Sequence, residues 1–121
     1  MAYLNVDEIE TALQSLAAEY PALTELIELP HRTHEGRLVR CLRLGADPQR
    51  PGVLLLGGVH AREWVPPDAL VSLAADLLEA GTLGTGLAYG NHHVPAARVR
   101  QVLAGTWSAQ SEADEARDRF A

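Results

Sequence analysis

The chain of 121 residues contains no lysine and a single cysteine. One cysteine excludes a framework of internal disulfides, and the apolar strand pattern around Cys41 predicts a buried, inert thiol. The ten basic residues are all arginine, and against 16 acidic residues they leave a net charge of -6. Because a nucleic-acid binder concentrates basic charge for phosphates, this balance argues against nucleic acid as a partner.

Long apolar runs are also missing. No stretch reaches the length needed to cross a bilayer, so we expect no membrane-spanning segment. The first six residues lack the basic and apolar regions of a signal peptide, which taken literally indicates a cytoplasmic protein. A piece separated from its leader shows the same features, so secretion stays open. The composition is that of an ordinary globular chain, long enough for one domain.

The first part of the chain predicts a helix and then a β-hairpin. Asn5 and Glu8 have the spacing of a capping box, and apolar residues continue at helical spacing until Pro21. The apolar-rich segments 23–30 and 38–44 predict two strands, and the residues 33–36 between them supply a turn.

The middle of the chain predicts a buried strand and a helix. Val53–Leu56 is an uninterrupted apolar run, which is typical of a strand covered on both faces in a parallel or mixed sheet. A stripe of leucine and alanine then predicts a helix that starts near Pro66 and stops at Gly81. The fold class is therefore α/β.

The last part predicts a loop and a short helix. Residues 81–90 are rich in glycine and threonine and indicate a loop. Residues 95–103 predict a helix with Val99, Val102 and Leu103 on one side.

The chemistry is concentrated in the segment 57–64, Gly-Gly-Val-His-Ala-Arg-Glu-Trp. His60 follows the predicted strand, at the end where open α/β sheets place their ligands. Glu63 stands at the entry to the next helix, where the helix dipole favours an ionised carboxylate. An imidazole nitrogen and a carboxylate oxygen are both zinc donors, and this spacing lets them reach one ion. The pattern also fits a loop histidine and a helix-start glutamate that bonds backbone N–H groups.

The whole string 57–64 resembles the zinc-binding segment of the carboxypeptidase A/B family, peptidase family M14. Further landmarks of that family follow in the same order, namely Tyr3-Leu4-Asn5, Glu35-Gly36-Arg37, the helix after Pro66, Tyr89-Gly90 and Ala96-Ala97-Arg98-Val99. Together they extend over about residues 3 to 104. The match ends at about Gly105, because the residues that follow do not resemble the next strand of the family.

The resemblance implies a partial three-layer α/β/α fold with a mixed sheet. Residues 1–105 then form the N-terminal part of a zinc carboxypeptidase catalytic domain, and residues 106–121 form a divergent, disordered tail. One Zn²⁺ is implied, with His60 and Glu63 as two of three protein ligands and Arg62 as a substrate-binding residue. The implied substrate is the C-terminus of a peptide or protein.

In the family, the third ligand and the general-base glutamate lie further along the chain. The resemblance therefore implies a truncated chain without a catalytic residue of its own, inactive by itself. A premature stop, a frameshift or a pseudogene-like fragment each explains that pattern.

Several alternatives stay open. His92 and His93, in the loop expected before the last helix, are the candidates for a replacement ligand, although adjacent loop histidines are usually solvated. His31, His34, Glu35 and Asp68 are better explained as turn and helix-start residues than as ligands or a base. The chain is otherwise a non-catalytic remnant that binds peptide or protein through open sheet edges. A related zinc amidohydrolase shares His-x-x-Glu, but Arg-Glu-Trp favours the carboxypeptidase branch. The sequence leaves the oligomeric state open.

Overall fold

The computed structural model describes residues 2–106. Its elements are, in chain order, α1 (Val6–Glu19), β1 (Thr24–Glu28), β2 (Arg40–Leu44), α2 (Val65–Leu83), β3 (Leu87–Tyr89), β4 (His92–Val94) and α3 (Ala96–Ala104). The chain is thus a mixture of helices and small antiparallel sheets, compatible with a partial α/β fold. The expected tail from residue 106 onward lies, apart from Thr106, outside the described residues.

Helix α1 begins where the sequence predicts. The Asn5 side chain accepts a hydrogen bond from the Glu8 N–H at 2.8 Å, and the Glu8 carboxylate accepts one from the Asn5 N–H at 3.1 Å. These two bonds satisfy backbone donors that the first turn of a helix otherwise leaves unpaired. The predicted capping box is confirmed.

The predicted hairpin is also confirmed. Strands β1 and β2 pair antiparallel, with Leu26 opposite Leu42 and Ile27 opposite Cys41. Charged residues face each other across the strands, because Arg43 lies 3.1 Å from the Glu25 carboxylate and Arg40 lies 3.7 Å from Glu28. Cys41 is half-buried, so the expectation of a buried thiol is wrong.

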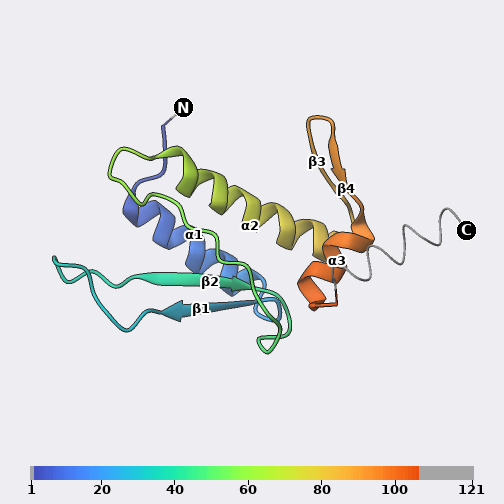
Figure 1. The fold of residues 1–121 in the computed structure, drawn as a ribbon, viewed down its shortest axis with the longest axis horizontal. Helices are drawn as coiled ribbons and strands as arrows, with labels where there is room; N and C mark the ends of the chain where they lie inside the picture. The colour runs from blue at the N-terminus through green and yellow to red at the C-terminus, as the bar shows by residue number, and fades with distance from the viewer. Residues whose placement is uncertain (1, 107–121) are drawn as a thin grey trace, which may run out of the picture.

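The helices pack on one another and on the hairpin. Helix α1 contacts both β1 and α2, and α2 contacts α3 (Figure 1). The buried core is small and apolar, and within the described residues it consists of Leu16, Ala74, Leu78, Ala80, Val99 and Leu103. Val99 and Leu103 of α3 are buried as expected, whereas Val102 is 48% exposed, contrary to expectation.

Helix α2 continues past the predicted stop. It ends at Leu83, and Gly84 caps it with a φ of 72° and an N–H bond to the Ala80 carbonyl of 2.9 Å. Gly81 lies inside the helix. A residue without a side chain is needed there because the Leu103 side chain of α3 occupies the space that a Cβ would need. The prediction that Gly81 terminates the helix is therefore wrong, because this glycine admits a neighbouring helix and Gly84 caps the end. No helix in residues 2–106 is both long and apolar enough to span a membrane.

The loop expected over residues 81–90 contains half of a second hairpin. Strands β3 and β4 pair antiparallel, with Leu87 opposite Val94 and Tyr89 opposite His92. His92 and His93 are thus strand residues, not loop residues. The local signal for this hairpin is the two-residue connection Gly90-Asn91, with a φ of 61° at Gly90.

The predicted buried strand Val53–Leu56 is not formed in this structure. The run has no strand assignment, and its four side chains are 56% to 88% exposed. Within residues 2–106, β1 pairs with β2 and β3 with β4, so no neighbouring strand bonds to this run. A buried strand needs hydrogen-bonding partners beside it and side chains over both faces. The apolar pattern is present, but residues 2–106 supply no strand that pairs with it.

Candidate metal centre

The candidate site lies on a loop that connects β2 to α2. In Figure 1 this segment runs back from the end of β2, past α1, to the start of α2. The loop closes on itself at its base. A Cβ on Gly57 would lie 3.0 Å from the Pro66 carbonyl carbon, and one on Gly58 would lie 2.9 Å from Pro67 Cγ. Gly58 also has a φ of 75°, which residues with a side chain rarely adopt. Both glycines therefore allow the loop to fold against the first turn of α2.

A turn at the tip of this loop brings the two predicted ligands together. The Glu63 N–H donates to the His60 carbonyl at 3.0 Å, and the His60 N–H approaches Glu63 Oε1 at 3.4 Å. His60 Nδ1 and Glu63 Oε2 are in direct contact, which becomes an ion pair when the imidazole is protonated. Sequence spacing predicted that both groups reach one point, and the turn shows how they do so.

The pair is open to solvent. The side chain of His60 is 76% exposed and that of Glu63 is 40% exposed. The two side chains offer one nitrogen and one oxygen donor that lie together and are accessible, and both are donor types that zinc binds. Within residues 2–106, however, no third histidine, cysteine, aspartate or glutamate joins them to complete a metal-binding group. The described residues therefore supply two donors and no more.

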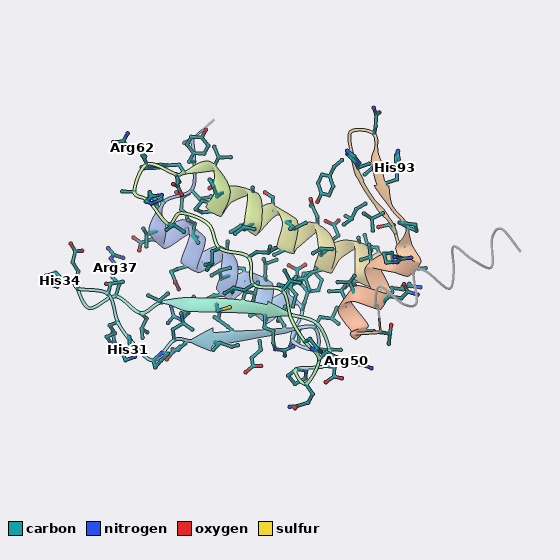
Figure 2. All side chains as sticks on the ribbon, viewed as in Figure 1. His31, His34, Arg37, Arg50, Arg62 and His93 are labelled. Atoms are coloured by element: carbon teal, nitrogen blue, oxygen red, sulfur yellow. The ribbon has the colours of Figure 1, made fainter. Side chains whose placement is uncertain are left out.

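Arg62 lies between the two donors in sequence and on the outside of the loop. Figure 2 shows its side chain projecting away from the body of the molecule. Within the described part of the chain, no hydrogen bond or ion pair to its guanidinium is formed. The group is thus accessible to a carbonyl or carboxylate of a ligand.

The other histidines lie elsewhere. Figure 2 shows His31 and His34 at the far loop of the β1–β2 hairpin and His93 beyond the opposite end of α2 from Arg62. A helix of 19 residues such as α2 is about 28 Å long. His92 and His93, on β4, follow that helix, whereas His60 and Glu63 precede it. In this fold they do not replace a missing ligand.

The carboxylates considered as a base are structural. Asp68 accepts hydrogen bonds from the Leu4 N–H at 3.2 Å and 3.4 Å, and Glu35 is an exposed residue of the hairpin turn. The contact between Asp68 and Leu4 joins residues 64 positions apart. No short-range sequence pattern signals it.

An open groove lies away from the loop. It has a volume of about 540 Å³ and is lined by Leu16, Glu19, Tyr20, Ala75, Glu79, Thr82 and Leu83, from the end of α1 and the second half of α2. Partial burial and the carboxylates of Glu19 and Glu79 raise the pKa of Tyr20. A hydrogen bond to Asp76 raises the pKa of Tyr89. Neither tyrosine adjoins the His60–Glu63 pair.

Comparison with known proteins identifies the family. The family model described as zinc carboxypeptidase, peptidase family M14, matches residues 9–85, which is more than half of the chain and includes His60, Arg62 and Glu63. The chain belongs to this zinc carboxypeptidase family.

Individual relatives that match the chain are also named as carboxypeptidases. Zinc carboxypeptidase A 1 of Anopheles gambiae is 40% identical over 76 residues, which are 63% of this chain and 17% of the relative. Carboxypeptidase B of Astacus astacus is 35% identical over 78 residues, 64% of this chain and 25% of the relative. An inactive metallocarboxypeptidase of Talaromyces marneffei is 34% identical over 73 residues, 54% of this chain and 12% of the relative. The chain thus spans a quarter or less of these relatives, and family membership alone does not establish activity.

Proposed function

We propose that the chain forms the N-terminal part of a zinc carboxypeptidase catalytic domain, with residues 1–105 as that part. In this proposal His60 and Glu63 are two of three zinc ligands and Arg62 binds the substrate peptide near its C-terminus. The observation that carries the proposal is the convergence of His60 Nδ1 and Glu63 Oε2 on a solvent-open turn. The match of the family model across this turn supports it.

Each residue has a distinct task. His60 offers a ring nitrogen and Glu63 a carboxylate oxygen, while the His60 N–H at 3.4 Å from Glu63 Oε1 orients the carboxylate. Arg62 offers N–H groups to a peptide carbonyl or terminal carboxylate, which a guanidinium binds with two parallel bonds. Zinc, when bound, acts as a Lewis acid on the peptide carbonyl and activates water.

The three-layer arrangement with a mixed sheet belongs to the same proposal. The uncovered apolar run Val53–Leu56 supports it, since leucine and valine side chains that are 56% to 88% exposed gain stability when a sheet and helices cover them. The strand that precedes the ligands then forms only with further elements beside it.

Zinc titration of the purified chain tests the ligand assignment. We expect His60→Ala and Glu63→Ala each to weaken zinc binding roughly tenfold or more, because each removes one of two donors. His34→Ala is the matched control, since His34 is an exposed loop histidine remote from the turn. Equal losses in His34→Ala and His60→Ala would overturn the assignment.

An activity assay tests the remaining claim. With zinc and an N-terminally blocked peptide that has a free C-terminal carboxylate, the 121-residue chain should release no amino acid above buffer. Two donors leave half of a four-coordinate zinc without protein ligands, and no third histidine, cysteine, aspartate or glutamate joins the pair within residues 2–106. Turnover that His60→Ala abolishes would show the chain to be an enzyme by itself.

A second candidate is a non-catalytic module that binds peptide or protein. The exposed run Val53–Leu56 and the open edges of two short hairpins favour it, because unpaired strand edges accept further strands. Size-exclusion chromatography combined with hydrogen exchange separates the two readings. A monomer in which residues 53–56 are fully protected from exchange would argue against such a module.

A further inference from the structure

The N-terminal segment lies on the first turn of α2, the helix that follows the candidate ligands in the chain. The Leu4 N–H donates to both oxygens of the Asp68 carboxylate, at 3.2 Å and 3.4 Å. The rings of Tyr3 and Trp64 are in tilted contact, with their centroids 6.4 Å apart and an angle of 54° between planes. Figure 1 shows the N-terminus beside the start of α2. We call these four residues, Tyr3, Leu4, Trp64 and Asp68, the N-terminal latch.

The start of α2 depends on such tertiary contacts because its local signals are weak. Trp64, at the N-cap position, makes no side-chain cap bond, in contrast to Asn5 of α1. Pro66 and Pro67 have no N–H for a cap to bind. Asp68 stands in the first turn, yet its carboxylate bonds Leu4 instead of its own helix. The latch therefore replaces a cap as the element that fixes this helix start.

The ligand loop also packs against the start of α2. Gly57 and Gly58 pack against Pro66 and Pro67, and Glu63 immediately precedes Trp64. Whatever moves the first turn of α2 moves Glu63 and the base of the loop together. The separation of His60 from Glu63 is consequently coupled to the latch, although no latch residue touches His60.

We infer that the N-terminal latch positions the His60–Glu63 pair for a zinc ion, with Asp68 and Tyr3 as positioning residues. This inference rests on the proposed function, because it assumes that the pair binds zinc. Groups that orient metal ligands from behind commonly change metal affinity about 10- to 100-fold when they are lost. The latch does so through the backbone that carries Glu63, not through a hydrogen bond to a ligand.

The decisive variants are Asp68→Ala and Asp68→Asn, with Asp76→Ala as the matched control. Asp76 is on the same helix and also accepts a long-range hydrogen bond, from the Tyr89 hydroxyl at 2.6 Å, but it lies two turns further along. Both alanine variants therefore lose one tertiary bond from α2. The full chain is measured twice, for zinc affinity by competition with a chromogenic chelator and, without metal, for hydrogen exchange of the amides of residues 61–65.

We expect Asp68→Ala to weaken zinc binding about tenfold and to accelerate exchange in residues 61–65. Asp68→Asn keeps an oxygen acceptor for the Leu4 N–H and should restore most of both properties. Asp76→Ala should leave both unchanged. If Asp68→Ala fails to fold, Tyr3→Ser replaces it, since Tyr3 is 51% exposed and its loss costs little core. The expected change is in the same direction and smaller.

The outcomes separate the latch from the metal assignment. Equal behaviour of Asp68→Ala and Asp76→Ala in both measurements overturns the latch. Zinc binding that does not respond to His60→Ala overturns the proposed function, and hydrogen exchange then decides alone whether the latch holds the turn. A loss of zinc affinity in Asp68→Ala without faster exchange also overturns it, because the effect then does not pass through the backbone.

Discussion

Two parts of the chain differ in how they are supported. One is the packed body, which consists of α1, α2, α3 and the β1–β2 hairpin, and the other is the loop that carries the candidate ligands. Leu78 and Val99 are fully buried at the contact of α2 with α3, whereas every residue from 51 to 62 is exposed. The body is held by contacts among elements that the described residues themselves provide. Among the described residues, this loop is held at its start by the Ala46 N–H, which donates to the Leu103 carbonyl at 2.7 Å, and further on by Gly57 and Gly58, which pack against Pro66 and Pro67. The candidate ligands thus lie on the less supported of these two parts, and functional residues are commonly found on such loops.

The largest expected effect is in the body. Leu78→Ala should lower the free energy of unfolding by about 2 to 5 kcal/mol, because it removes a side chain with no solvent exposure and leaves a cavity. Urea unfolding followed by far-UV circular dichroism measures the loss. Leu83→Ala is the control on the same helix, since Leu83 is 66% exposed. Equal losses in the two variants would mean that the body is not packed as described.

A smaller effect is expected at the start of α1. Asn5→Ala should lower the free energy of unfolding by about 1 kcal/mol, because the Glu8 N–H loses its acceptor. The thermal midpoint of the purified variant measures this loss, and Gln14→Ala, on an exposed position of the same helix, is the control. An unchanged midpoint in Asn5→Ala would show that packing against β1 and α2, and not the cap, fixes α1.

Some of these structural features are predictable from the sequence and others are not. The capping box at Asn5 and the first hairpin were predictable because their signals lie within a few residues of one another. The end of α2 was not, since Gly81 serves a contact with Leu103, which is 22 positions away in sequence. The second hairpin does have a local signal, the two-residue connection Gly90-Asn91.

At the candidate metal site, too, short-range features are predictable from the sequence and long-range contacts are not. The proximity of His60 and Glu63 follows from their spacing in one turn, and the structure brings the two side chains together. The bond between Leu4 and Asp68 joins the two ends of a long stretch of chain, so pattern analysis has no access to it. Whether the pair binds zinc and whether Arg62 binds substrate remain predictions that titration and assay decide.

The smallest change in stability is expected for a substitution in the exposed run Val53–Leu56, and it tests most directly whether this loop is less supported than the packed body. Leu54→Ser should change the free energy of unfolding by no more than about 0.5 kcal/mol, because the side chain is 71% exposed and packs against no core. In a strand covered on both faces, the same substitution would cost several times more, as Leu78→Ala does. Urea unfolding of the two variants side by side therefore measures whether residues 53–56 are covered. A large loss in Leu54→Ser would show that this run is buried in solution, as its apolar pattern predicts, and that the ligands stand on a supported strand.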